Sequence, residues 1–174
     1  RISARAVELH RKLYGRFDHR TGFALYARGK VLQKLGRYKN AGELVEKARA
    51  LFAEAIGPNH PHTATMDATL LDIYREMGDI DEAARHGEAA LTAYRTHLDS
   101  TDERITRVKS GLGAVRTKQN RFRQAERLLR TALEVAERTG QEEKAETARE
   151  RLNVLRDTRD RSSSARSATS TDRR

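Results

Sequence analysis

The sequence predicts an all-α fold built from repeated antiparallel helix hairpins. Similar residues recur every 42 positions, and within each period the apolar residues follow the i, i+3, i+4, i+7 spacing of a helix with one buried face. The composition is consistent with a helical fold, because the 174 residues include only two prolines, which would interrupt helices, and 37% hydrophobic residues. The lack of cysteine excludes disulfides, cysteine-ligated metals and thiol nucleophiles.

The 42-residue period is clearest where the first helix of each hairpin should end. Gly36, Gly78 and Asn120 occupy this position, and glycine and asparagine most readily adopt the left-handed conformation of a helix C-cap. Corner residues and small alanines follow at the same interval: Tyr38, Ile80 and Phe122; Ala41, Ala83 and Ala125; Ala48, Ala90 and Ala132. The alanines allow the two helices of a hairpin to approach closely.

The individual helices follow from local start and stop signals. Gly57-Pro58-Asn59-His60-Pro61 closes one hairpin, since glycine ends a helix and proline cannot continue one. Asp79-Ile80-Asp81-Glu82 opens another helix, where carboxylates cap the free N–H groups and interact favourably with the helix dipole. Helices are therefore expected at 1–14, 22–35, 38–56, 62–77, 80–97, 102–118, 121–139 and 141–157.

We expect one repeat array over residues 1–157. Ala6 lies 42 residues before Ala48, so residues 1–22 form the tail of an earlier repeat, and the chain is expected to be part of a larger protein. Three repeats follow at 23–61, 62–102 and 103–140. Residues 141–157 keep one thin apolar stripe on a charged helix, which suits a terminal cap. Residues 158–174 carry no apolar type except alanine, which predicts a disordered tail.

The repeats resemble tetratricopeptide repeats, in the 42-residue form of kinesin light chains and of the repeat regions of many bacterial regulatory proteins. The residues that carry this resemblance are Gly29, Leu32, Gly36, Tyr38, Ala41 and Ala48; Leu70, Leu71, Tyr74, Gly78, Ile80, Ala83 and Ala90; and Gly113, Asn120, Phe122, Ala125 and Ala132. The resemblance implies a right-handed superhelix, an α-solenoid in which the first helices of the hairpins line a concave groove.

The family's ligand contacts come from the first helix of each hairpin. Carried over by position, the candidate partner-binding residues are Phe23, Tyr26, Lys30, Lys34, Thr65, Asp72, Arg75, Glu76, Arg107 and Lys118. Kinesin-light-chain-like repeats usually place asparagine at the positions of Ala27, Thr69 and Gly111, where it holds an extended peptide. This departure, and the lack of a lysine and asparagine carboxylate clamp, argue against both standard binding modes.

Charge is distributed unevenly along the chain. The total is +10, but residues 62–102 carry a net −6 between neighbours of +4 and +6. A continuous basic track of the kind that nucleic acid requires is thus interrupted, which argues against a nucleic-acid partner. The groove is predicted to have mixed sign and to favour a protein or peptide segment, including another domain of the same chain.

No catalytic constellation or cofactor motif emerges, so we expect a protein that is not an enzyme and binds no cofactor. His60-Pro61-His62 could ligate a metal, but no third ligand is near in sequence and the resemblance implies a structural role in the turn. No metal site is predicted. The lack of a signal peptide and of a long apolar run predicts a cytoplasmic protein without a membrane partner.

The sequence therefore favours a protein-interaction scaffold. We expect it to be the C-terminal repeat region of a larger bacterial regulatory or signalling protein that binds a partner segment in its concave groove. Two alternatives stay open: a basic helical domain that binds nucleic acid, and an intramolecular regulatory domain of a multidomain ATPase or transcription regulator.

Overall fold

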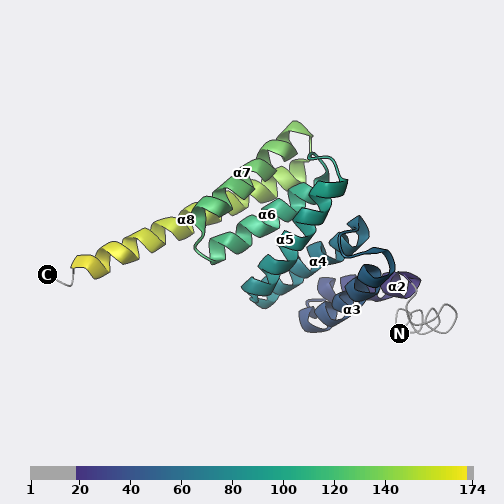
Figure 1. Ribbon diagram of the computed structural model, residues 1–174. Helices are drawn as coiled ribbons and strands as arrows, with labels where there is room; N and C mark the ends of the chain where they lie inside the picture. The colour runs from purple at the N-terminus through teal and green to yellow at the C-terminus, as the bar shows by residue number, and fades with distance from the viewer. Residues whose placement is uncertain (1–18, 172–174) are drawn as a thin grey trace. The chain divides into compact units, whose positions relative to one another are not determined.

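The computed structural model describes residues 19–171, and this part of the chain consists of seven α-helices without a β-strand (Figure 1). The chain divides into two compact units between Ser100 and Thr101. The first unit contains α2 (His19–Lys34), α3 (Tyr38–Ile56), α4 (Pro61–Met77) and α5 (Ile80–His97). The second contains α6 (Glu103–Lys118), α7 (Phe122–Arg138) and α8 (Glu142–Thr171). The all-α prediction is confirmed, whereas the helix expected at 1–14 lies outside the described residues.

The turns inside the hairpins repeat with the period of the sequence. Gly36, Gly78 and Asn120 have φ angles of 70°, 82° and 57°, in the left-handed region that glycine and asparagine tolerate best. The N–H of the following residue then bonds to the carbonyl five residues back in each turn: Arg37 to Leu32, Asp79 to Tyr74 and Arg121 to Arg116, each at 2.9 Å. These bonds satisfy carbonyls that the helix end leaves free, and they confirm the predicted C-caps.

Side chains also cap the helix starts. His60 Nδ1 accepts a hydrogen bond from the N–H of His62 at 3.1 Å, with Pro61 in the first turn of α4. Asp79 accepts from the N–H of Glu82 at 3.3 Å, as the capping interpretation of that acidic cluster predicts. Helices α3 and α5 begin and end at the predicted residues, and α2 begins three residues earlier than expected.

The core of the first unit lies between the predicted apolar faces of α3 and α4. Ala41, Val45 and Phe52 of α3 are at most 1% exposed and pack with three buried residues of α4, namely Met66, Leu70 and Ile73. The small side chain at Ala41 lets neighbouring helices come close, as the 42-residue alanine pattern predicts. This packing fixes α2, α3, α4 and α5 as two consecutive hairpins of one unit.

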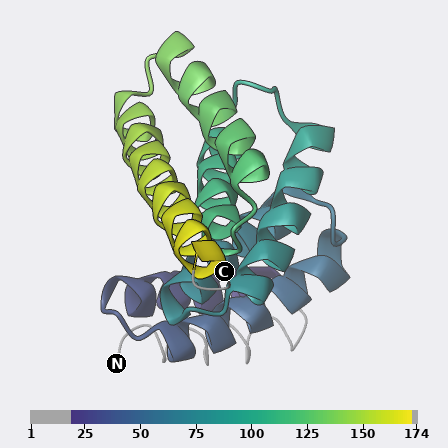
Figure 2. The same cartoon turned by 90° about the vertical axis from the view of Figure 1, so that its left-hand side faces the viewer.

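In the second unit α7 lies beside α8 along its length (Figure 2). Ala125 and Leu129 of α7 form a core with Leu155 of α8, and Phe122 and Leu152 pack against it. The apolar stripe predicted for the capping helix is thus the side of α8 that is buried, since Ala145 and Ala148 are also inaccessible.

Helix α8 is longer than the sequence predicts. The expected cap ends at residue 157 and a disordered tail was expected over 158–174, but the backbone is helical through Thr171 and projects past the α6–α7 hairpin (Figure 1). Residues 158–171 contain no glycine or proline that would end a helix. Ser162 and Ser164 instead donate hydrogen bonds to carbonyls one turn back, at 2.9 and 3.0 Å. A packed helix already supplies the nucleus, so continuation does not require an apolar face.

Replacing either of two helical glycines by alanine should change the free energy of unfolding, but in opposite directions. A Cβ at Gly113 would lie 2.5 Å from Cγ of Leu129, which is fully buried, whereas a Cβ at Gly42 would lie 3.6 Å from Cγ2 of Ile73. We expect Gly113→Ala to lower the free energy of unfolding by about 1 to 3 kcal/mol through overpacking. Gly42→Ala should raise it by about 0.5 to 1 kcal/mol, because alanine loses less backbone entropy. Urea unfolding of both variants tests this, and stabilisation by Gly113→Ala would contradict the packing.

Candidate partner-binding face

The first helices of the two hairpins in the first unit, α2 and α4, meet through a side-chain contact. The hydroxyl of Tyr26 on α2 lies 3.2 Å from Oγ1 of Thr69 on α4, which brings these two helices together along the predicted ligand side. Thr65, one turn before Thr69, accepts a hydrogen bond from the Tyr94 hydroxyl at 3.0 Å. The predicted residues Tyr26 and Thr65 thus use their hydroxyl groups in hydrogen bonds between helices.

An aromatic cluster forms one end of the face. The ring of Phe23 meets Phe52 edge to face with centroids 4.7 Å apart, and it lies 5.8 Å from the ring of His62. Phe52 is buried, but Phe23 keeps 43% of its surface exposed. Phe23 therefore combines a core contact with apolar surface that a partner can cover.

The charged residues predicted for this face have different surroundings. Arg75 pairs with Glu76 at 2.8 Å and approaches Asp72 at 3.9 Å, so three of the predicted residues partly neutralise one another. Lys30 donates to Gln33 at 3.0 Å. Lys34 is exposed and makes no hydrogen bond or ion pair with the side chains described, those of residues 21–164, which leaves its charge available to a partner.

The two remaining predicted residues, Arg107 and Lys118, belong to α6 of the second unit. Both side chains are exposed, and neither has a polar partner in the described part of the chain. The structure thus gathers eight of the ten candidates on α2 and α4 and places two on α6.

A buried polar cluster joins the two hairpins of the first unit, and the sequence analysis did not find it. His86 of α5 is 0% exposed. Its Nδ1 lies 2.7 Å from Oδ1 of Asp67 on α4, and its Nε2 lies 2.9 Å from Oε1 of Glu46 on α3. Each ring nitrogen faces a carboxylate, which suits an imidazolium that donates from both nitrogens.

Further groups complete this cluster. Arg49 of α3 donates to Oδ1 of Asp67 at 2.6 Å, and the ring of Tyr74 stacks on His86 with centroids 5.4 Å apart. Nη2 of Arg85 lies 2.7 Å from Nε2 of His86, to which it can donate only when that nitrogen carries no proton, and it also pairs with Glu82 at 2.5 Å. With His86 protonated, three cations balance three carboxylates, so the buried charges are compensated.

The surroundings shift two pKa values in opposite directions. Burial alone would lower the pKa of His86, but hydrogen bonds to Asp67 and Glu46 and the charge of Glu46 outweigh it and raise the pKa above 6.5. The hydrogen bond from His86 holds the pKa of Glu46 below 4.5, against the opposing effect of burial. Both shifts favour the charged forms of the pair.

A signal for this cluster was present in the sequence. In the 42-residue frame His86 stands where Leu44 and Leu128 stand, and Arg49 stands where Leu91 and Leu133 stand. A polar residue at a position that is leucine in the other repeats indicates a buried polar contact. The sequence does not show that two such side chains contact each other, because they are separated by about 20 to 40 residues.

Two further properties bear on function. Within residues 19–171 no three or more histidine, aspartate or glutamate side chains are arranged to hold a metal ion. None of the helices described has the length and apolar character needed to cross a membrane.

Comparison with known proteins identifies the repeats. Residues 23–96 match the family model described as tetratricopeptide repeat. A 102-residue segment is 29% identical to Protein KINESIN LIGHT CHAIN-RELATED 3 of Arabidopsis thaliana. This segment is 58% of the chain but spans only 16% of the length of that relative.

Solved structures show the same fold. The chain resembles the crystal structure of nearly identical TPR-like repeats from a Podosopora anserina protein described as a kinesin light chain, with a TM-score of 0.69 and 16% identity over 89% of this chain and 84% of the other. It also resembles BtubC (BKLC) from P. vanneervenii, with a TM-score of 0.70 and 23% identity over 88% of this chain and 63% of the other. The fold is therefore an α-solenoid of helix hairpins, and residues 23–96 are similar to tetratricopeptide repeats.

Proposed function

We propose that the chain is a scaffold that binds a segment of a partner protein on the face formed by α2 and α4. Tetratricopeptide repeats generally mediate protein–protein interaction, which supports the class of function. The Tyr26–Thr69 contact is the observation that carries the site, because it joins the ligand-side helices of two consecutive hairpins into one face.

The chemistry of the face suggests what the partner segment offers. Exposed Phe23 can accept an apolar side chain, and Lys34 can pair with a carboxylate. Glu76 is 45% exposed and can also accept a hydrogen bond from a basic side chain. The proposed partner segment therefore carries an apolar residue and charges of both signs. We place this scaffold in a larger bacterial regulatory or signalling protein. Arg107 and Lys118 of α6 are proposed as partner contacts of the second unit by itself.

Matched charge reversals test the proposed face. Lys30→Glu/Lys34→Glu alters α2, and the control Lys39→Glu/Lys47→Glu alters two exposed lysines of α3 by the same charge. Both variants should melt like the wild type, since surface substitutions change stability by about 0.5 kcal/mol or less. Affinity capture from the source lysate, quantified by mass spectrometry, should lose a specific protein only with the α2 variant. Equal capture by all three proteins, or equal loss from both variants, would reject this face.

A further inference from the structure

The second unit carries an arginine-rich surface on the outer side of α7 and the adjoining edge of α8. We call it the arginine face, and it consists of Arg123, Arg127, Arg130, Arg156 and Arg159. These residues line two depressions of about 460 and 90 Å³. Both depressions include Glu126 and Arg130, so they form one continuous surface.

Several charges of the arginine face are not neutralised by the protein. Arg130 pairs with Glu126 at 2.6 Å, and Arg159 approaches the same carboxylate at 3.9 Å. Arg123, Arg127 and Arg156 are exposed and have no hydrogen bond or ion pair to their guanidinium groups among residues 21–164, whose side chains the structure describes. Glu126 thus interacts with two arginines, and the guanidinium groups of the other three can bind a partner.

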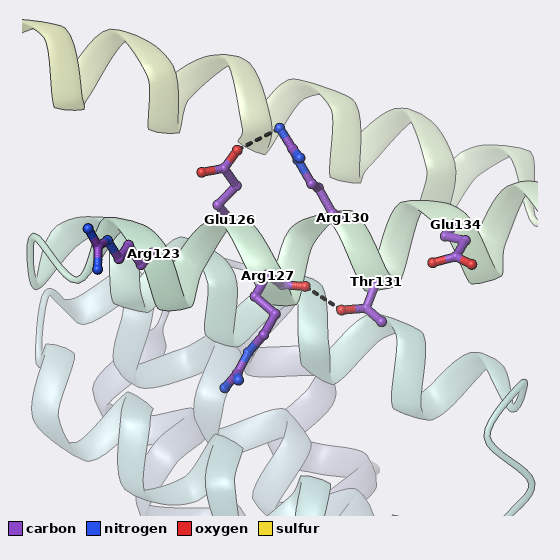
Figure 3. Close-up of a pocket in the computed structure, with 6 residues that line it drawn as sticks. All are labelled: Arg123, Glu126, Arg127, Arg130, Thr131 and Glu134. Atoms are coloured by element: carbon purple, nitrogen blue, oxygen red, sulfur yellow. Dashed lines mark hydrogen bonds and ion pairs between the residues drawn. The ribbon is translucent and has the colours of Figure 1, made fainter.

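The arginines of α7 form a regular row. Arg123, Arg127 and Arg130 are spaced i, i+4, i+7, so their Cα atoms lie on one side of the helix, about 6 and 10 Å along the axis from the first, while their side chains diverge (Figure 3). Figure 3 shows Arg130 and Glu126 directed toward α8 and Arg127 directed away from it. Beside this row, half-buried Leu152 of α8 adds apolar surface to the smaller depression.

We propose that the arginine face binds an acidic amphipathic helix of a partner protein. Guanidinium groups bind carboxylates through two parallel hydrogen bonds, and glutamates spaced i, i+4, i+7 on a partner helix would match the spacing of the row. Apolar residues next to those glutamates would cover Leu152. The three arginines without a partner supply the charge complementarity for this occupant.

A nucleic acid fits this surface less well than an acidic helix does. Glu126 and Glu134 lie among the arginines and would repel phosphates. Arg149 of α8 is already held by Glu137 of α7 at 2.7 Å and by Glu142 and Glu146 of its own helix at 3.1 Å each. Carboxylates therefore interrupt the positive surface, and a continuous phosphate backbone cannot follow it.

The arginine face is separate from the face of the proposed function. It is built from α7 and α8 of the second unit, whereas the proposed groove contacts on Lys30 and Lys34 belong to the first. Each surface can therefore be altered without changing the other, and failure of one proposal leaves the other open to its own test.

Binding of a designed peptide tests the proposal. The probe is a fluorescein-labelled helical peptide with glutamates at i, i+4 and i+7 on one side and leucines beside them, and a scrambled peptide of equal composition is the comparison. Fluorescence anisotropy is measured at about 0.15 M salt. Arg123→Glu/Arg127→Glu reverses the row, and Arg37→Glu/Arg95→Glu makes the same charge change at exposed arginines of the first unit.

We expect the row variant to bind the helical peptide about tenfold or more weakly than the wild type, and the control to change its affinity less than about twofold. The milder Arg123→Gln/Arg127→Gln should show an intermediate loss, with unchanged melting in every variant. Equal loss in both reversals, equal binding of the scrambled peptide, or no binding by the wild type would overturn the proposal. Tighter binding of single-stranded oligothymidylate than of the peptide, lost in the row variant, would instead assign the face to nucleic acid.

Discussion

Replacing His86 by leucine is expected to lower the free energy of unfolding by about 3 kcal/mol, although leucine occupies the equivalent position in both other repeats. The substitution removes the donor that faces Asp67 at 2.7 Å and Glu46 at 2.9 Å. Asp67 is 1% exposed and cannot turn to water. Arg49 still pairs with Asp67, which places the expected loss at the lower end of the range for breaking a buried ion pair.

The matched control converts the cluster to the apolar form used elsewhere in the repeats. In the 42-residue frame Arg49, Asp67 and His86 correspond to Leu91, Leu25 and Leu44 respectively. Arg49→Leu/Asp67→Leu/His86→Leu should therefore recover the wild-type stability to within about 1 kcal/mol, since well-packed apolar residues often replace a buried ionic cluster without loss. Urea unfolding at pH 6 measures all three proteins. A single variant as stable as the wild type would show that the cluster contributes nothing.

The second large effect is a loss of stability as the pH rises above 6.5. The pKa of His86 is raised in the folded protein, so folding favours its protonated form. The stabilisation is fully present below the ordinary value of 6.5 and disappears as the pH rises through the folded pKa. Glu46 acts in the opposite direction, because its pKa is lowered below 4.5 and its contribution disappears as the pH falls through that lowered value. Stability from the pair is therefore greatest between about pH 4.5 and 6.5.

Thermal melting across this range tests the pH dependence. We expect the melting temperature of the wild type to fall by a few degrees between pH 6 and 9, at about 2 to 4 °C for each kcal/mol in a chain of 174 residues. The Arg49→Leu/Asp67→Leu/His86→Leu variant lacks the imidazole and should show a much shallower slope. Parallel curves for the two proteins would mean that His86 does not change its charge on folding in this range.

The fold can be predicted from helix caps and small buried residues that are recognisable in the sequence. The Gly36 and Gly78 C-caps, the corner residue Tyr38 and the buried Ala41 are positions where backbone geometry or close packing allows few residue types. Each can be identified from its own neighbours and from its recurrence at the 42-residue period. The same reasoning misjudged the end of α8, because helix continuation beyond residue 157 depends on a packed helix before it rather than on local apolar pattern.

The candidate face was predictable only as positions on helices. The sequence placed Tyr26 and Thr65 on the ligand side of their helices, but not the hydrogen bonds that occupy their hydroxyl groups. It identified Arg75 and Glu76 as charged groups but not their mutual pairing at 2.8 Å. Such pairings depend on side-chain rotamers and on neighbouring helices. A family resemblance therefore indicates which positions are candidates, but not which hydrogen bonds and ion pairs their side chains form.

By itself the sequence determined the helix hairpins, their period and the small residues at their closest contacts, because these depend on interactions within a few turns of chain. Only the tertiary structure decided that His86, Asp67 and Glu46 meet, since they come from three helices and are brought together by packing. It also decided which arginines of α7 have no carboxylate partner among the side chains described at residues 21–164, because that depends on what the neighbouring helices place within reach.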